Sequence, residues 1–203
     1  MNKPENRNRI HVREIGPDDW PVISELFGER GACGGCWCMH WRREKRGKAW
    51  EELKGEPNKR AFKKLIESDQ AHGIVAFSGD HPIGWCSFGR RSEFPRLLRT
   101  KAYQLSDETA GTQAGIWSVN CLFLDKSYRN MGVSQLLVDA AVKAIRKRKG
   151  KVVEAYPVTL TQDGQKLPAA FAFTGPEIIY QRLGFKEVQR LARSRPLYRL
   201  ELA

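Results

Sequence analysis

The stretch that decides the fold is Cys121-Leu-Phe-Leu-Asp-Lys-Ser-Tyr-Arg129-Asn-Met-Gly132-Val-Ser134, in which an apolar segment passes through a short turn into a helical pattern. Residues 116–124 form an apolar run of the length of a buried strand. After the turn, apolar residues recur at intervals of three and four, which predicts an amphipathic helix. They are Val133, Leu136, Leu137, Ala140, Ala141, Ala144 and Ile145. A strand that leads into a helix in this way predicts an α/β chain.

The turn before this helix is suited to bind an anion. The first backbone N–H groups of a helix have no partner within the helix, and the positive end of the helix dipole attracts phosphate. Gly132 lets a ligand approach the backbone, since it has no Cβ. A simple turn explains the same residues equally well, because one glycine between a strand and a helix does not specify a phosphate site.

The residues before this stretch predict a strand, two helices and a β-hairpin. Residues 9–14 alternate between apolar and polar side chains, and the Gly-Pro-Asp-Asp turn that follows can cap a helix over residues 20–27. A basic helical stretch covers residues 48–68, with a break at its Gly-Glu-Pro sequence. Residues 73–77 and 83–88 predict two strands joined by a tight turn with Gly and Asp, so we expect them to pair antiparallel.

The residues after the helix complete a mixed sheet. Gly150 ends the helix, and a strand at residues 152–156 follows it, so the alternation of strand, helix and strand predicts one parallel pair. A short helix at residues 177–183 precedes strands at residues 185–189 and 197–200. We therefore expect an α/β (α+β mixed sheet) fold. Its central sheet is mostly antiparallel, has about six or seven strands and carries helices on both faces.

The composition indicates a single domain over residues 1–203, with residues 1–8 expected to be disordered. The length suits one core, and no Pro, Gly or Ser tract marks a linker. The polar first ten residues are unlike a secretory signal, and no apolar run approaches membrane-spanning length. The cysteines are odd in number, and Cys86 and Cys121 lie in predicted strands, which indicates buried thiols. We expect a cytoplasmic monomer or homodimer without a membrane partner.

The net charge of +12 indicates an anionic partner. Nucleic acid, an acidic membrane surface and a phosphate-rich small molecule all satisfy this requirement, and composition alone does not choose among them. A basic nucleic-acid-binding module that uses residues 90–101 and 146–151 is one alternative function. Nucleic acid is not the expected partner, because no recognisable binding motif accompanies the charge. Solvated helix faces explain much of the clustering.

Two motifs resemble the signatures of the GNAT N-acetyltransferases. Arg129-x-x-Gly132-x-Ser134 is similar to the pyrophosphate signature of that superfamily, which is Gln or Arg, two residues, Gly, one residue, and Gly or Ala. Ser134 departs from the last position but is also small. The segment Ile178-Ile-Tyr-Gln-Arg-Leu-Gly-Phe185 resembles the second signature, and the separation of the two motifs is the expected one. The resemblance covers roughly residues 9–190.

The resemblance implies the GNAT acyltransferase fold, acetyl-CoA as co-substrate, and direct attack by a neutral primary amine without a covalent enzyme intermediate. In that family, backbone groups of a bulged strand bind the pantetheine arm and polarise the thioester carbonyl, and preorganised N–H donors stabilise the oxyanion. The acceptor, a small-molecule or protein amine, is not identified. A catalytically silent CoA-binding domain is a further alternative. The implied cofactor-binding residues are Leu122, Phe123, Leu124, Arg129, Asn130, Met131, Gly132, Val133 and Ser134.

Two residues are candidates for proton transfer. Tyr180 matches the position of the family's general acid, which protonates the departing thiolate; its structural alternative is packing of the short helix. Phe173 stands where the family usually has Asn. Glu154 is the candidate general base, because a carboxylate inside an apolar strand is costly unless it is paired or faces a cavity. A structural salt bridge explains Glu154 equally well, and Ser118 and Asn120 are alternatives that would hold a relay water.

The segment Cys33-x-x-Cys36-x-Cys38-x-His40 contains four possible zinc ligands. Structural zinc sites usually draw on two separated ligand pairs, whereas these four lie within eight residues, so no metal is expected. We expect this loop to fold over the acceptor site instead, with Trp37 and Trp41 forming an apolar wall. Asn120 is the third candidate for substrate contact. The long connection at residues 90–114 is another, because connections of that length tend to carry function.

Overall fold

A computed structural model describes residues 10–44, 46–104, 115–159, 161–162, 165–166, 171–192 and 194–202. Residues 1–8, which we expected to be disordered, lie outside the described residues. So do residues 105–114 of the predicted connection. In the described part of the chain, no helix is both long and apolar enough to cross a membrane.

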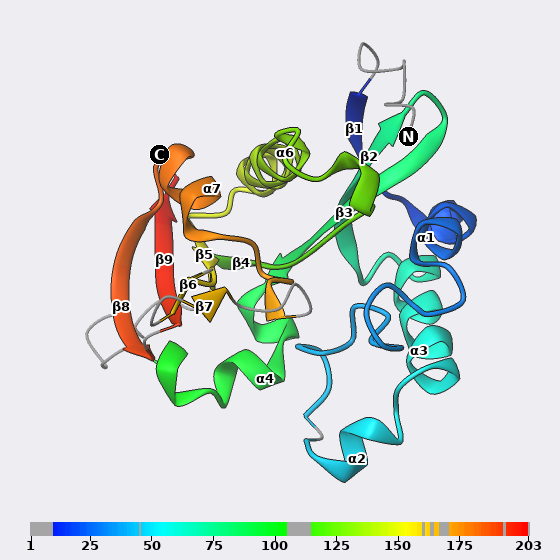
Figure 1. The fold of residues 1–203 in the computed structure, drawn as a ribbon, viewed down its shortest axis with the longest axis horizontal. Coiled ribbons are helices and arrows are strands. Elements are labelled where there is room, and N and C mark those ends of the chain that lie inside the picture. Colours follow the sequence, from blue (N-terminus) through cyan, green and yellow to red (C-terminus); the bar gives the residue numbers. More distant parts are fainter. Residues whose placement is uncertain are drawn as a thin grey trace.

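The described residues contain one large sheet, and its strand order is β1-β2-β3-β4-β5-β9-β8 (Figure 1). The strands are β1 (Ile10–Glu14), β2 (His72–Ser78), β3 (His81–Arg90), β4 (Ile116–Leu124), β5 (Val152–Ala155), β8 (Lys186–Ala192) and β9 (Arg195–Glu201). All neighbours pair antiparallel except β4 and β5, which are parallel. This confirms the predicted mixed sheet. A separate small hairpin of β6 (Thr161–Gln162) and β7 (Gln165–Lys166) escaped prediction, because two-residue strands carry no periodicity.

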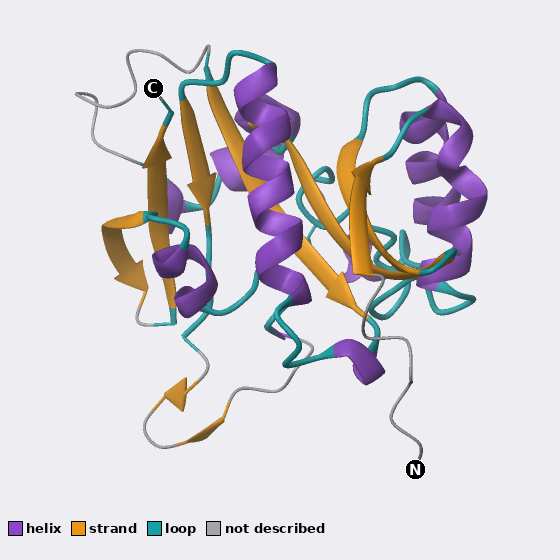
Figure 2. Ribbon diagram, turned by 90° about the horizontal axis from the view of Figure 1, so that it is seen from above, coloured by secondary structure: helices purple, strands orange, loops and turns teal. Residues whose placement is uncertain are grey.

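Helices cover both faces of the sheet, as predicted (Figure 2). One face packs against α6 (Val133–Lys147) and α7 (Glu177–Arg182), and the other against α1 (Trp20–Phe27) and α3 (Glu56–Glu67). Strand β2 shows the reason: Ile74 and Ala76 join the core under α6, whereas Val75 and Phe77 join the core under α1 and α3.

Short helices fill the connections. The break predicted in residues 48–68 is present, since α2 and α3 are separate and Gly55 precedes α3 with a φ of +76°. The described part of the 90–114 connection folds into helical turns whose side chains form a third core with Trp41 and Tyr156. The remaining elements are α2 (Lys48–Glu51), α4 (Pro95–Leu98), η2 (Pro17–Asp19), η3 (Arg91–Glu93), η4 (Lys101–Tyr103) and η5 (Lys126–Tyr128).

Strand β4 is bulged at the centre of the molecule. Its neighbour β3 pairs Ser87 with Cys121 and Phe88 with Val119, so Asn120 is the extra residue. The parallel pairing of β4 with β5 ends at Val119. The two strands therefore stop pairing at the bulge, and the last residues of β4 have a free edge on the β5 side.

Candidate active site

The turn between β4 and α6 presents free backbone donors. Gly132 precedes α6 with a φ of +81°, in the left-handed region, and Asn130 also has a positive φ of +61°. Within the described residues, the N–H groups of residues 130–134 donate no hydrogen bond. A Cβ at Gly132 would meet no atom within 4 Å, so the turn opens to solvent. Such a turn can accept a pyrophosphate.

The free edge of β4 is occupied by another part of the chain. The backbone N–H of Leu122 donates to the carbonyl oxygen of Phe173 at 2.6 Å. This contact places residues 171–175, the segment that leads into α7, beside the end of β4 (Figure 1). The predicted pantetheine-binding N–H of Leu122 thus already has a partner in the chain.

A cavity of about 270 Å³ lies between the cysteine loop (residues 33–40), the end of β4 and the residues before α7. Trp41 lines it, as predicted for a substrate contact. Trp37 is not among its lining residues; its side chain is 1% exposed and packs against Trp20 and Phe27 in the core. The lining residues are Phe27, Ala32, Cys33, Cys36, Cys38, His40, Trp41, Trp50, Lys54, Cys121, Leu122, Phe123, Phe171 and Phe173.

Asn120 supports this cavity from the β4 bulge. Its carbonyl oxygen accepts a hydrogen bond from Nε1 of Trp41 at 2.8 Å, which fixes the indole against the strand. The Asn120 side chain is 1% exposed, and its amide nitrogen has no hydrogen-bond partner within the described part of the chain. Asn120 therefore positions Trp41, although it does not itself line the cavity.

The cysteine loop brings several thiols to the cavity. Nε1 of Trp85 lies 3.3 Å from Sγ of Cys38, and hydrogen bonds from Cys121 and Trp85 lower the pKa of Cys38 to about 7. Burial raises the pKa of Cys36 to about 12. Among the residues described, no group of three or more His, Cys, Asp and Glu side chains is placed to hold a metal ion. Only the fold brings Cys121 to this loop, so no sequence pattern indicates that these thiols lie together.

His40 is an uncharged edge of the cavity. Nη1 of Arg96 lies 3.0 Å from Nδ1 of His40, and the imidazole packs edge to face against Trp41 and Trp50. Burial, followed by the charge of Arg96, lowers the pKa of His40 to about 3. The imidazole is therefore neutral at physiological pH.

Tyr180 is fully buried in α7, the helix that follows the segment in contact with β4. Its hydroxyl donates to the carbonyl oxygen of Thr174 at 2.7 Å, and its ring packs edge to face on Phe185. Burial raises the pKa of Tyr180 well above its ordinary value of 10. The hydroxyl thus remains a proton donor and points at the segment that occupies the edge of β4.

Glu154 is enclosed by cations. Its carboxylate lies 3.0 Å from Nε of Arg91 and 2.7 Å from Nη2 of Arg199, and it accepts from the hydroxyl of Tyr156 at 2.8 Å. The residue is 0% exposed and does not line the cavity. This geometry favours the structural salt bridge over the general base. The Ser118 hydroxyl is likewise engaged, 3.0 Å from that of Tyr156.

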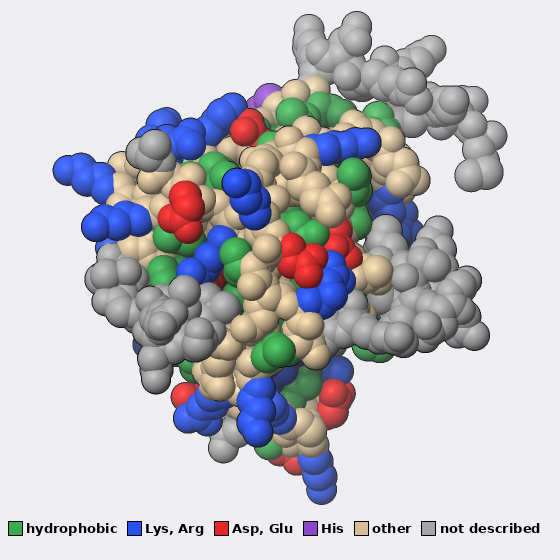
Figure 3. All heavy atoms as spheres, turned by 90° about the vertical axis from the view of Figure 1, so that its left-hand side faces the viewer, with side chains coloured by type: hydrophobic (Ala, Val, Ile, Leu, Met, Phe, Trp, Pro, Cys, Tyr) green, Lys and Arg blue, Asp and Glu red, His purple; other side chains and the backbone are tan. Residues whose placement is uncertain are grey.

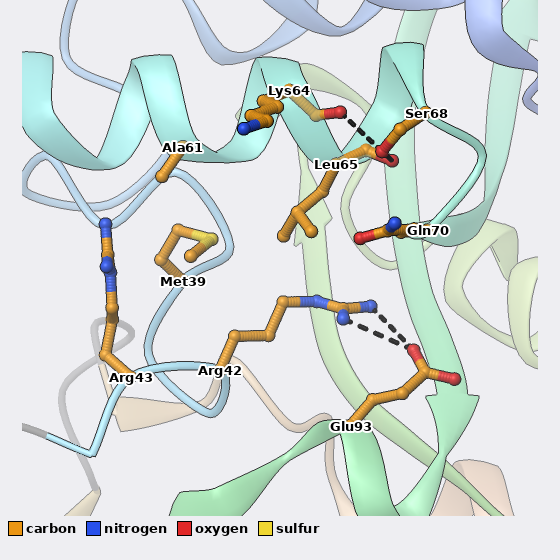
Figure 4. A pocket seen from close by; sticks show the side chains of 9 residues that line it. All are labelled: Met39, Arg42, Arg43, Ala61, Lys64, Leu65, Ser68, Gln70 and Glu93. Carbon is orange, nitrogen blue, oxygen red and sulfur yellow. Dashed lines mark hydrogen bonds and ion pairs between the residues drawn. The ribbon is translucent and has the colours of Figure 1, made fainter.

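A second cavity, of about 460 Å³, lies between α3, the cysteine loop and η3 (Figure 4). The guanidinium of Arg42 crosses it and pairs with Glu93 at 3.2 Å, while Met39 and Leu65 supply apolar walls. Glu93 belongs to the connection predicted for substrate contact, whereas none of the individually predicted site residues lines this cavity.

The basic residues do not gather into one continuous surface on the face shown in Figure 3, where Lys and Arg side chains alternate with acidic side chains and backbone. Several of them are used inside the fold, since Arg42, Arg91 and Arg199 pair with buried or half-buried carboxylates. These three guanidinium groups are therefore engaged within the fold and do not contribute to a nucleic-acid-binding surface.

Comparison with known proteins identifies the family of this α/β chain. The family model described as "Acetyltransferase (GNAT) family" matches residues 38–166, which is more than half of the chain. The chain therefore belongs to the GNAT acetyltransferase family, and the prediction of an acetyl-CoA-dependent N-acetyltransferase is confirmed. No curated protein sequence matches the chain with significance.

Three solved structures of similar fold are two N-acetyltransferases and one putative acetyltransferase. The PaiA N-acetyltransferase from Thermoplasma acidophilum, in complex with coenzyme A, is 15% identical with a TM-score of 0.54, over 96% of this chain and 99% of that one. The putative acetyltransferase YncA from Salmonella typhimurium, with acetyl-CoA, is 14% identical with a TM-score of 0.54, over 97% and 95%. A ribosomal-protein-alanine N-acetyltransferase from Brucella melitensis is 15% identical with a TM-score of 0.53, over 95% and 99%. At these identities the likeness shows the fold.

Proposed function

We propose that this protein transfers the acetyl group of acetyl-CoA to the primary amine of a small-molecule acceptor bound in the 270 Å³ cavity. The observation that carries the proposal is the bulge at Asn120, where β4 and β5 stop pairing. The strand end after the bulge lines the cavity through Cys121, Leu122 and Phe123, and it continues into the turn whose free donors precede α6. A cofactor held along β4 would thus place its thioester beside the acceptor.

The cofactor residues divide into two groups. The turn at residues 129–134 would hold the pyrophosphate through its free N–H groups and the positive end of α6. The backbone of Leu122, Phe123 and Leu124 would hold the pantetheine arm. Because Phe173 already accepts from the Leu122 N–H, residues 171–175 must release that donor when the arm binds.

The chemistry follows from these positions. Acetyl-CoA supplies the thioester, and the lone pair of the amine forms the new C–N bond as the C–S bond breaks. A β4 N–H directed at the carbonyl oxygen would stabilise the negative charge that develops there. The hydroxyl of Tyr180 would turn from the Thr174 carbonyl oxygen to the leaving thiolate, deliver its proton there and recover one from the acylated nitrogen. The net reaction yields an amide and free CoA.

A thermal-shift titration tests the cofactor site. Acetyl-CoA and CoA, but not ATP, should raise the Tm of the wild type, because ligand at about 100 times Kd stabilises by about 2.7 kcal/mol. Gly132→Glu should abolish this shift by placing a carboxylate in the phosphate site. Gly79→Glu is the matched control, since Gly79 also has a positive φ of +61° and open space at its Cβ, but lies in the β2–β3 turn.

Equal protection of wild type and Gly132→Glu would mean that the pyrophosphate binds elsewhere. An equal shift with ATP would reduce the site to a general polyanion site and contradict the proposal.

A further inference from the structure

The acceptor cavity is lined mainly by aromatic rings. Around His40, the ring of Trp41 lies at 4.8 Å, that of Phe173 at 5.3 Å and that of Trp50 at 5.6 Å, measured between centroids. Phe27, Phe123 and Phe171 add further rings to the lining. Flat walls of this kind bind a flat apolar ligand by stacking.

Aromatic walls can also bind cations, but here cations already occupy two of the rings. The guanidinium of Arg96 lies 4.9 Å from the centre of the Trp50 ring, and that of Arg195 lies 5.1 Å from the centre of Phe173. A cationic ligand between these walls would meet positive charge behind both of them. The usual attraction of an aromatic box for an ammonium group is therefore opposed.

The described lining of the cavity carries one cation and no carboxylate. Lys54 is the charged side chain among the described lining residues, and its ammonium pairs with the exposed Glu51 outside the lining at 2.7 Å. Two further cations lie beside the lining, since Arg96 is 3.0 Å from His40 and Arg195 lies over the ring of Phe173. Burial first, and then these charges, lower the pKa of His40.

No Asp or Glu belongs to the described lining, so the cavity offers no carboxylate to an ammonium group. The one lining thiol whose pKa is lowered, that of Cys38, is buried and hydrogen-bonded to Trp85 and Cys121.

We propose that the acceptor is an aromatic amine whose amino group is uncharged at neutral pH. This inference rests on the proposed function and adds the substrate class to it. The nitrogen lone pair of such an amine is free without a base, so it attacks the thioester carbon directly. The C–S bond breaks, the thiolate takes up one proton, and the nitrogen loses one, which gives an N-aryl amide and free CoA. The proton balance is closed within the reactants and Tyr180.

The test compares aniline with benzylamine, which has the same ring and one further methylene but is protonated at neutral pH. The measurement is CoA release at pH 7, with cyclohexylamine as the non-aromatic control. We expect a kcat/KM for aniline at least about tenfold above that for benzylamine. On raising the pH to 9, the benzylamine value should climb about tenfold per unit as its neutral fraction grows, while the aniline value stays level.

A charge variant tests how far electrostatics causes the preference for an uncharged amine. Lys54→Glu should narrow the preference for aniline over benzylamine, because it places a negative charge in the lining. Lys48→Glu makes the same charge change on the exposed surface of α2, outside the lining, and should leave the preference unchanged.

The outcomes separate the two proposals. If acetyl-CoA fails to protect the protein in the thermal-shift titration, the proposed function itself fails. If acetyl-CoA binds but benzylamine or cyclohexylamine is acetylated at pH 7 as fast as aniline, or no aromatic amine is acetylated, the substrate class is wrong and the cofactor site stands.

Discussion

The backbone N–H of Leu122 and the carbonyl oxygen of Phe173 are joined by a hydrogen bond of 2.6 Å. This bond closes the edge of β4 just beyond the bulge, where β5 no longer pairs with it. The Phe173 ring, at the same time, packs against His40 and Trp41 in the cavity wall. One segment therefore contacts both the proposed cofactor strand and the proposed acceptor cavity.

Phe173→Ala should strengthen acetyl-CoA binding severalfold. Loss of the ring removes the packing that holds residues 171–175 against β4, so the cofactor displaces them at lower cost. Isothermal titration calorimetry with acetyl-CoA gives the Kd. Phe171→Ala is the matched control, because its ring is 56% exposed and belongs to the same segment. An unchanged or weaker affinity in Phe173→Ala would show that this segment does not compete with the cofactor.

Tyr180→Phe should lower turnover by about tenfold or more while leaving the Kd for acetyl-CoA unchanged. Since burial raises the Tyr180 pKa well above 10, the wild-type rate should show no loss from tyrosine ionisation between pH 7 and 10. The lost hydrogen bond to Thr174 should cost about 1 kcal/mol or somewhat more of stability. If the variant keeps the full turnover rate, Tyr180 is not the general acid and only packs the short helix.

Glu154→Gln should destabilise the fold by about 3 kcal/mol, because Arg91 and Arg199 would keep their buried charges without the carboxylate. Urea denaturation measures this loss. Glu187→Gln, at an exposed carboxylate on β8, is the control and should cost less than about 1 kcal/mol. A Glu154→Gln protein of wild-type stability that is inactive would instead restore the general-base interpretation.

His40 should make the protein sensitive to acid. Its pKa in the folded state is about 3, against 6.5 in the unfolded chain, so the unfolded state binds more protons between these values. The contribution of neutral His40 to the stability of the fold is therefore complete above pH 6.5 and is lost as the pH falls toward 3. His40→Gln should therefore lose less stability than the wild type between pH 8 and pH 5, by on the order of 1 to 2 kcal/mol. Parallel losses in the two proteins would contradict the shift.

The sequence predicted the elements whose information is local. The strand at 116–124, the helix after Gly132 and the hairpin at 73–88 are all present with nearly the predicted bounds. Each depends on a periodicity or a turn within one short segment, which a single sequence displays. The separation of the two signature motifs then indicated the family, which the family model confirmed.

The candidate site followed the sequence only in part. Trp37 and Trp41 look alike in the sequence, yet the first lies in the core and the second lines the cavity. Their tertiary contacts differ, because Trp37 packs against Trp20 and Phe27, whereas Trp41 donates a hydrogen bond to the β4 bulge; Trp37 and Cys38 also have positive φ values. The hydrophobic pattern of a sequence does not predict which residues other than glycine adopt a positive φ.

By itself the sequence determined the order of the elements of the large sheet, the parallel pair and the position of the turn before α6, since these follow from residues close together in the chain. Only the tertiary structure decided the partners of Glu154, which come from η3 and β9, and the contact of Phe173 with β4. It also decided that guanidinium groups lie over the rings of the cavity. The physical reason is that charge compensation and cavity shape depend on side chains that meet across large separations in sequence, and no local pattern records those meetings.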